Sequence, residues 1–420
     1  MEASATVKPA DMRPPERVAC CIAGGGPAGM MLGLLLARAG VDTLVLEKHK
    51  DFLRDFRGDT VHPSTLQVLD DLGLIDKLLA LRHSQVDKVQ LLTSRGLFTI
   101  GDFSRLRIKY PYIALVPQWD FLSMLADEAK RLPTFRLLME AEAQRLVRES
   151  GGVTGLQYWA DGQMRTIRTV LTVAADGRHS TLRDQAKLPI VENSPPMDVL
   201  WFSLPRAPSD FANIVFRAGG SKLIAFIDRF DYWQVGYIIP KGAAQQILAQ
   251  GVDAVKQGLH ELAPEFDDRL DTLESVDQIK LLTVQSNRLR RWWLPGFLCI
   301  GDAAHAMTPV GGVGINLAIQ DGVAAANALW SPLTRQRIDD GSLAAVQRRR
   351  TWPTEMTQAM QALVQKRIIH AVLTSDGPVD VPPLLRFFLR LPLVRDFPAR
   401  FVGVGVRPER PSPALLAARV

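Results

Sequence analysis

The N-terminal part of the chain alternates between strand-like and helical patterns. The apolar run VACCIAG (residues 18–24) has the length of a buried parallel strand, and PAGMMLGLLLARAG (27–40) has a helical pattern with Gly40 as its C-terminal cap. The run VDTLVLE then returns as a second strand, which ends at Glu47. This order predicts a β-α-β unit in a parallel sheet.

The same alternation continues along the chain. It predicts an amphipathic helix from Ser64, a favourable N-cap, to Leu72, and another helix after Gln118. Residues 170–183 indicate a strand that ends in Ala-Ala-Asp-Gly. Asp176 then lies at the carboxyl end of a strand, where α/β sheets bind ligands.

Residues 197–240 have a different pattern. Short apolar runs are separated by turn signals such as AGGS and DRFD, which predicts an antiparallel sheet and a candidate lid or floor for a substrate. Trp233, Val235 and Tyr237 share one face of a strand because side chains alternate along it. The stripe that they form belongs either to the core or to a substrate surface.

The C-terminal part is mostly helical from residue 325 onward, with SPLTRQRIDDGS as an interruption. The basic and apolar segment PPLLRFFLRLPLVRDFPARFVG either packs onto the body of the protein or touches a membrane surface. We expect no integral membrane segment. The apolar run from Val18 to Leu36 is interrupted by glycines and Pro27, and no other run approaches the about 20 residues that a span requires.

Composition and charge narrow the class of protein. The chain has 420 residues, 47% of them apolar, and so can bury the core of a large α/β protein. Its net charge of +6 is modest, and no basic run is interleaved with aromatic residues, so we expect no nucleic-acid binding. The cysteines Cys20, Cys21 and Cys299 lie in apolar runs without metal-ligand spacing, which favours a reducing, cytoplasmic compartment. We expect a monomer or a homodimer.

The first glycine-rich turn, GGGPAG, has the spacing of a dinucleotide site. Gly24 allows a tight turn, Gly26 lets the backbone approach a pyrophosphate, and Gly29 lets the helix pack closely on the strand. The N-terminus of that helix then faces the phosphates. Glu47, at the end of the next strand, can accept both hydroxyls of an adenosine ribose, or it is simply a solvated strand end.

A second glycine-rich segment, GDAAHAMTPVGGVGINLAIQDG (301–322), follows a strand predicted over residues 297–300. Asp302 can accept hydroxyls of a sugar or ribityl chain, and the glycines from 311 to 314 leave room for a planar ring. The N–H groups of Ile315 and Asn316, at the start of a helix, can face a ring carbonyl. The two turns therefore predict one long ligand, FAD, held at both ends.

Three motifs in order make the chain similar to the single-component flavoprotein monooxygenases of the para-hydroxybenzoate hydroxylase type. They are GGGPAG with Glu47, ADGRHSTLR at Asp176, and GDAAHAMTPVGGVGINLAIQD, and the resemblance covers residues 17–345. The resemblance implies cofactor contacts at Gly24, Gly26, Pro27, Ala28, Gly29, Glu47, Lys48, Arg57, Gln118, Asp176, Asp302, Pro309, Gly314, Ile315 and Asn316.

The resemblance also implies an activity. NAD(P)H reduces FAD, O2 adds at flavin C4a, and the distal oxygen of the hydroperoxide is transferred to an aromatic or other electron-rich small molecule. Pro309 lies where the family has a proline whose carbonyl faces the substrate. His305 is either a proton carrier or a structural histidine. The histidines are scattered and predict no metal site, and the absence of G-x-S-x-G excludes a serine hydrolase of that type.

Three other functions fit the same fold. A flavin-dependent halogenase carries W-x-W-x-I-P, whereas VGYIIP places Val235 and Tyr237 where the tryptophans stand. A reductase or epoxidase that acts on an isoprenoid is compatible with the apolar, basic C-terminus. A non-catalytic binding protein is disfavoured by the intact glycine loop.

The predicted fold class is α/β, with a Rossmann-like FAD-binding domain, an inserted antiparallel-sheet substrate domain and C-terminal helices. The domain boundaries that we expect are 1–16 for a disordered tail, 17–80, 110–190 and 285–345 for the FAD-binding domain, 81–109 and 191–284 for the substrate domain, and 346–420 for the C-terminal helical region.

Overall fold

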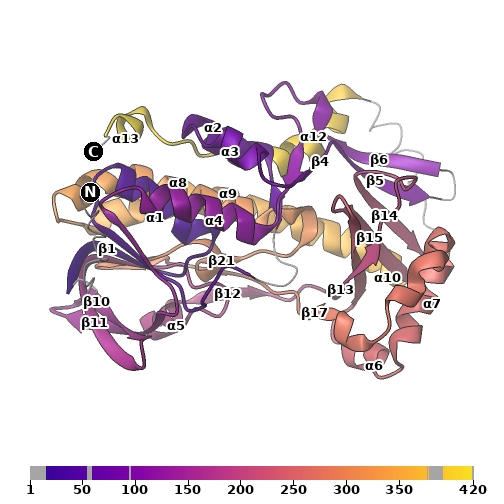
Figure 1. The fold of residues 1–420 in the computed structure, drawn as a ribbon, viewed down its shortest axis with the longest axis horizontal. Helices are drawn as coiled ribbons and strands as arrows, with labels where there is room; N and C mark the ends of the chain where they lie inside the picture. The colour runs from indigo at the N-terminus through magenta and orange to yellow at the C-terminus, as the bar shows by residue number, and fades with distance from the viewer. Residues whose placement is uncertain (1–15, 54–58, 94–95, 376, 378–390, 419–420) are drawn as a thin grey trace, which may run out of the picture.

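The computed structural model describes residues 16–53, 59–93, 96–375, 377 and 391–418. Two large sheets lie at opposite ends of the longest axis, and the helices α8 (Gly314–Thr334) and α9 (Asp340–Val364) run between them (Figure 1). This arrangement confirms the predicted α/β class with a Rossmann-like part, a second, largely antiparallel sheet and C-terminal helices.

The first sheet has eight strands. Its main path is β19-β20-β11-β1-β2-β8, and β10 and β9 branch from β11. The strands are β1 (Arg17–Ala23), β2 (Thr43–Leu46), β8 (Phe135–Leu138), β9 (Glu142–Glu149), β10 (Gly152–Ala160), β11 (Gln163–Ala174), β19 (Trp293–Leu294) and β20 (Phe297–Cys299). Because β1 is parallel to β2 and β11, and β11 is parallel to β20, the carboxyl ends of these four strands meet at one edge.

Helices α1 (Pro27–Arg38) and α4 (Gln118–Lys130) pack on this sheet, and α8 packs on α1. The contact between α1 and α8 is close because it is built on glycine. A Cβ at Gly322 would lie 2.9 Å from the carbonyl oxygen of Ala28, and one at Gly301 would lie 3.0 Å from the Ala28 Cβ. Two glycines of the second motif therefore serve helix packing.

The second sheet has seven strands in the order β17-β13-β16-β15-β14-β5-β6. They are β5 (Lys88–Thr93), β6 (Gly96–Asp102), β13 (Met197–Pro205), β14 (Ile214–Gly219), β15 (Lys222–Asp228), β16 (Tyr232–Pro240) and β17 (Lys280–Leu282). All pairs are antiparallel except β5 with β14. Helices α6 (Ala244–Leu248) and α7 (Val252–Leu262) cover its outer face (Figure 1).

Two small sheets lie between the large ones. One is β3 (Thr60–Val61), β7 (Ile113–Leu115) and β4 (Ser84–Val86), and the other is β12 (Ile190–Asn193), β18 (Ser286–Leu289) and β21 (His305–Ala306). The short helices nearby are α2 (Pro63–Asp71), α3 (Ile75–Leu79) and α5 (Thr181–Ala186).

The start of α2 differs from the prediction. The helix begins at Pro63, with His62 rather than Ser64 at the N-cap, and no side chain caps it. Proline suits the first helical position because its fixed φ matches the helix and its missing N–H would lack a partner there.

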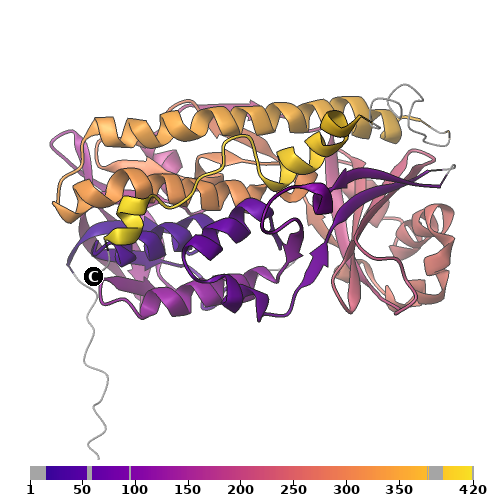
Figure 2. The same cartoon turned by 90° about the horizontal axis from the view of Figure 1, so that it is seen from above.

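The C-terminal region is helical, but the predicted interruption begins later than expected. Helix α8 continues through Pro332 to Thr334, and α9 runs through a π-helical turn, η6 (Gln365–Ile369), into α10 (His370–Leu373). Helices α12 (Pro392–Gly403) and α13 (Pro413–Ala417) follow, and α12 packs on β6. Figure 2 shows the segment between them passing over α8.

Two further expectations concern membranes and cysteines. Within the described ranges, no helix is long and apolar enough to span a bilayer. Cys20 and Cys21 on β1 and Cys299 on β20 are fully buried, and burial raises the pKa of each thiol. The expected tail, residues 1–16, lies outside the described residues apart from Glu16.

Candidate functional site

Predicted site residues gather at the carboxyl edge of the first sheet. Each follows one of the four neighbouring parallel strands β1, β2, β11 and β20, and they are Gly24, Glu47, Asp176 and Asp302. Parallel sheets bind ligands at this edge because loops and helix N-termini diverge there. The topology therefore brings together motifs that are far apart in the sequence.

The three motif glycines of the first turn have different surroundings. Gly24 has φ +109°, and a Cβ there would lie 2.3 Å from the carbonyl oxygen of Ala175. A Cβ at Gly29 would lie 2.0 Å from the carbonyl oxygen of Gly24, so both positions are fixed by the protein's own packing. A Cβ at Gly26 would meet no described heavy atom within 4 Å. The space beside Gly26, at the N-terminus of α1, fits a phosphate group.

Glu47 orients this turn. It is 7% exposed, its Oε2 accepts a hydrogen bond from the N–H of Gly25 at 3.0 Å, and its Oε1 accepts one from His49 at 3.1 Å. Lys48, the next residue, is exposed. The Glu47 carboxylate is thus fixed beside the turn, in the position from which a strand-end acid accepts ribose hydroxyls.

The other two strand ends are linked through one loop. Asp176 Oδ2 accepts a hydrogen bond from the N–H of Leu182 at 3.4 Å, and burial raises the pKa of Asp176. Arg178, in the same loop, lies 3.4 Å from Asp302 Oδ2, and the Asp302 side chain is 30% exposed. A partly exposed carboxylate with one long contact keeps capacity for a ligand hydroxyl.

The second glycine loop is pressed against β3. Gly311 and Gly312 have φ +79° and +62°, and the carbonyl of Pro309 accepts a hydrogen bond from the N–H of Gly312 at 3.0 Å. A Cβ at Gly312 would lie 2.8 Å from Thr60 Oγ1, and that hydroxyl donates to the Gly312 carbonyl at 2.8 Å. A side chain at Gly312 would therefore displace the loop.

Asn316, in the first turn of α8, uses its side chain for structure. Its Oδ1 accepts hydrogen bonds from the N–H of His62 at 2.9 Å and from Thr65 Oγ1 at 2.7 Å, and its Nδ2 donates to the carbonyl of Thr60 at 2.9 Å. Gly314, Ile315 and Asn316 form the N-terminus of α8, which has no side-chain cap. Their backbone N–H groups can therefore serve a ligand.

Gln118 begins α4 and connects to the second sheet. Its N–H donates to Asp59 Oδ1 at 3.2 Å, and Asp59 forms a buried ion pair with Arg229 in the turn between β15 and β16. Arg229 also donates to Gln234 at 2.9 Å, and burial lowers the pKa of Arg229 to about 10. Arg57, predicted to contact the cofactor, lies outside the described residues.

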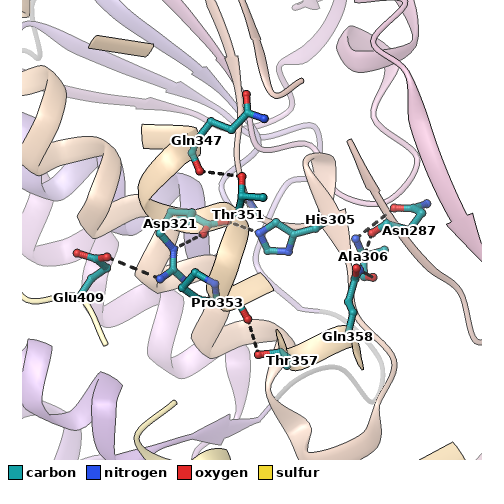
Figure 3. A network of polar contacts seen from close by, with 12 residues as sticks. Asn287, His305, Ala306, Asp321, Gln347, Thr351, Pro353, Thr357, Gln358 and Glu409 are labelled. Atoms are coloured by element: carbon teal, nitrogen blue, oxygen red, sulfur yellow. Dashed lines mark hydrogen bonds and ion pairs between the residues drawn. The ribbon is translucent and has the colours of Figure 1, made fainter. Parts of the chain in front are cut away.

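His305 lies in a buried polar network, in which its Nδ1 has no hydrogen-bond partner among the described residues (Figure 3). The ring is 1% exposed, and its Nε2 donates to Asp321 Oδ2 at 2.6 Å. Asp321 also accepts from the N–H of Gly301 at 3.0 Å and from Arg350 at 2.8 Å. Burial acts to raise the pKa of Asp321, but the neighbouring His305 and Arg350 outweigh it, and the net pKa lies below its ordinary value. These surroundings favour the structural interpretation of His305 over proton transfer.

Asp321 and Arg350 were not among the residues predicted from the sequence. One signal was available, because Asp321 is the single charged residue in the apolar run from Ile315 to Leu329. A charge on the buried face of a helix requires a partner of opposite charge. Arg350, which is 1% exposed, is that partner.

The aromatic stripe on β16 faces away from the glycine loop. Trp233, Val235 and Tyr237 pack with Val255 and Leu259 of α7 in the outer core. Trp233 also donates to Asp210 at 2.9 Å. This placement favours the alternative in which the stripe belongs to the hydrophobic core. The opposite face of the strand, with Ile238, is turned toward the rest of the molecule.

No group of three or more histidine, cysteine or acidic side chains that could hold a metal ion occurs in the described part of the chain.

Comparison with known proteins gives a family match over most of the chain. Residues 17–360 match the family described as FAD binding domain. The chain is 33% identical over 352 residues to a 6-methylpretetramide 4-monooxygenase of Streptomyces rimosus, which covers 83% of this chain and 84% of the relative. It is 30% identical over 306 residues to an uncharacterized aromatic compound monooxygenase of Bacillus subtilis, and the match covers 71% of this chain and 59% of that relative.

Solved structures share the fold. PqsL of Pseudomonas aeruginosa, in complex with 2-aminobenzoylacetate, has a TM-score of 0.75 at 20% identity and covers 85% of this chain and 97% of PqsL. The flavin-dependent brominase Bmp2 has a TM-score of 0.75 at 19% identity and covers 92% and 93%. At these identities the likeness concerns the fold alone.

Proposed function

This chain belongs to the FAD binding domain family and is an FAD-dependent monooxygenase, and from that premise we propose that it hydroxylates an electron-rich aromatic compound. The resemblance inferred from the three motifs is thereby confirmed. The observation that carries the proposal is the family match over residues 17–360. In this chain, the residues of the three motifs meet at one edge of the first sheet. Two relatives, a 6-methylpretetramide 4-monooxygenase and an aromatic compound monooxygenase, support an aromatic substrate.

The residues at the sheet edge fit FAD. We propose that the adenosine diphosphate half lies over the turn at Gly26 beside Glu47, because that space is free and faces a helix N-terminus. The flavin half then lies near the loop at Pro309 and the N-terminus of α8, with Asp302 accepting ribityl hydroxyls. When bound, FAD supplies the redox chemistry and the activation of O2.

We propose NADH or NADPH as the electron donor and oxygen transfer through a C4a-hydroperoxyflavin, as the resemblance implies. This chain's part is to bind and orient the cofactor, to exclude water and to position the substrate. The apolar face of the second sheet and the helices beside it support such exclusion of water.

A halogenase is the nearest rival. The brominase Bmp2 has a similar fold, but Val235 and Tyr237 stand where the halogenase motif has tryptophans, and both pack in the outer core. A non-catalytic binding protein does not fit the monooxygenase relatives, and an epoxidase or reductase that acts on an isoprenoid stays as an alternative that coupled oxygenation of a phenol would disfavour.

The test follows NAD(P)H oxidation and hydrogen peroxide separately over a panel of mono- and polycyclic phenols. We expect a yellow protein that releases free FAD on heating, and at least one phenol for which NAD(P)H consumption exceeds peroxide release and the product carries one oxygen atom from labelled O2. A colourless protein, or peroxide equal to NAD(P)H consumed with every phenol, would contradict the proposal. Bromide-dependent bromination would support the rival.

A variant tests the proposed placement of FAD. Asp302→Ala should raise the Kd for FAD roughly ten- to hundredfold, since a hydrogen bond to a charged group contributes about 1.5–3 kcal/mol. Arg178→Met is the matched control, because it removes the described partner of Asp302 and leaves the carboxylate. If the two variants bind FAD equally, Asp302 contributes only by holding the loop of Arg178 in place and does not itself bind FAD.

A further inference from the structure

The inner face of the second sheet, opposite α6 and α7, packs against both the glycine loop and the end of α9. Val199, Leu223, Ala225 and Ile238 from the sheet lie in one apolar cluster with Ile369 of η6, and Val310 of the loop packs against it. We call these six residues the inner cluster. Figure 1 shows α10, which continues from η6, beside β15. The inner cluster is therefore where the loop at Pro309 meets the second sheet.

Buried polar atoms without hydrogen-bond partners border the inner cluster. In the described part of the chain they include Gln361 Oε1, Gln365 Nε2, Thr308 Oγ1 and Trp201 Nε1. Gln361 and Gln365 are each 4% exposed and Thr308 is 3% exposed, and Trp201 packs against the inner cluster. Buried polar groups are rarely left unpaired in folded proteins because desolvation without a partner destabilises the fold.

Gln361 fixes the glycine loop on both sides of Pro309. Its Nε2 donates to the carbonyl of Thr308 at 3.0 Å and to that of Val310 at 2.8 Å. Both N–H groups of the amide are thereby used, and Oε1 is left as an acceptor.

Gln365 lies between this loop contact and the inner cluster. It follows Gln361 by one helical turn, and Ile369 of the inner cluster follows it by another, so the three share one side of the helix. The chain is π-helical over Gln365–Ile369, a local irregularity that often marks functional sites.

From these contacts we propose that Gln365 and Gln361 form the polar end of the substrate site. The N–H of Gln365 donates to a carbonyl or phenolic oxygen of the substrate, Gln361 Oε1 accepts a hydroxyl hydrogen, and the inner cluster contacts the aromatic rings. This inference rests on the proposed aromatic substrate. It assigns specificity to the end of α9 rather than to the stripe on β16.

The first experiment needs no ligand. Gln365→Leu in the FAD-loaded protein should leave Tm unchanged or raise it, because the variant removes a buried amide nitrogen that has no hydrogen-bond partner among the described residues. Gln358→Leu is the matched control on the same helix. The Gln358 amide donates to the carbonyls of Asn287 and Ala306 at 2.9 and 3.3 Å, and its Oε1 accepts from Arg288 at 3.3 Å (Figure 3). The control should lose about 2–6 °C. An equal loss in Gln365→Leu means that its amide has a structural partner, such as bound water, and overturns the proposal.

The second experiment uses 1-naphthol and naphthalene as probes, with binding followed by the change in flavin absorbance. Gln365→Leu should weaken 1-naphthol binding at least about fivefold and change naphthalene binding less than about twofold, because only 1-naphthol carries a hydrogen-bonding oxygen. Equal loss for both probes, or no loss for either, overturns the role of Gln365. If 1-naphthol does not bind the parent protein, the result counts against the proposed aromatic substrate, and the Tm comparison decides the unpaired state of Gln365.

Discussion

At the scale of single residues, two glycines of one motif have opposite surroundings. Gly26 faces free space and Gly29 contacts the carbonyl of Gly24. Gly26→Val should keep the fold, because its φ of −73° suits any residue, yet abolish FAD binding by filling the phosphate space. Gly29→Ala should destabilise the protein with or without FAD, since its Cβ would lie 2.0 Å from the Gly24 oxygen.

The measurement is flavin content of the purified variants together with Tm of the FAD-free proteins. A Gly26→Val protein that retains full flavin would show that no phosphate lies at this turn. A Gly26→Val protein that loses stability as much as Gly29→Ala would mean that the turn is closed by packing alone.

His62 gives a prediction for pH dependence. The ring is fully buried, its Nδ1 donates to the carbonyl of Val402 at 2.8 Å, and burial lowers its pKa from 6.5 to about 4. Between these two values the unfolded chain binds the additional proton, so stability is complete above pH 6.5 and falls as the pH approaches 4. The loss should reach about 3 kcal/mol.

We expect His62→Asn, which removes the titrating ring, to show a smaller loss of unfolding free energy between pH 7 and pH 5. Chemical denaturation at both pH values measures the difference. Identical pH dependence in the two proteins would show that His62 does not titrate in this range.

At the scale of elements, Asp321 joins α8, β21 and α9. Asp321→Asn should destabilise the protein by about 3–5 kcal/mol, because it removes the carboxylate that Arg350 contacts at 2.8 Å and leaves the buried guanidinium, among the described carboxylates, only the longer contact to Glu409 at 3.8 Å. Asp339→Asn is the control, since Asp339 caps the N-terminus of α9 by accepting from Ser342 at 2.7 Å and asparagine caps equally well. Equal denaturation midpoints for the two variants would contradict the assignment of Asp321 as the centre of the network.

The elements also show what the sequence can predict. The β-α-β unit follows from local periodicity and glycine spacing, and the structure has β1, α1 and β2 where the pattern indicated them. The side of β16 that packs in the outer core could not be predicted. Seven of its nine residues, the consecutive run from Trp233 to Ile239, are buried, and no apolar-polar alternation distinguishes the two faces. The Asp321 network depends on residues from three distant segments, and single-sequence patterns do not report such pairing.

At the scale of the whole molecule, the C-terminal segment ties several parts together. The Val402 carbonyl accepts from His62, Asn327 of α8 donates to the carbonyl of Arg410 at 2.9 Å, and Glu409 pairs with Arg349 of α9 at 2.5 Å. Ending the chain before residue 391 should therefore lower Tm and weaken FAD binding. Val402 contacts His62, the His62 N–H donates to Asn316 Oδ1, and Asn316 Nδ2 donates to the carbonyl of Gly312 in the glycine loop. Ending it after Ala418 is the control, and equal Tm and FAD affinity in the two truncated proteins would contradict this role.

The complete burial of the three cysteines has a consequence for an enzyme that uses O2 as a substrate. Oxidants attack thiolates, and burial keeps Cys20, Cys21 and Cys299 protonated and out of reach. Peroxide that escapes during idle turnover would instead meet thioethers at the surface, such as Met164 and Met356, which are 49% and 39% exposed. Met164 lies at the start of β11, away from the carboxyl end of that strand, and Met356 lies on α9, so conversion to sulfoxides would change exposed side chains while the three cysteines stay buried.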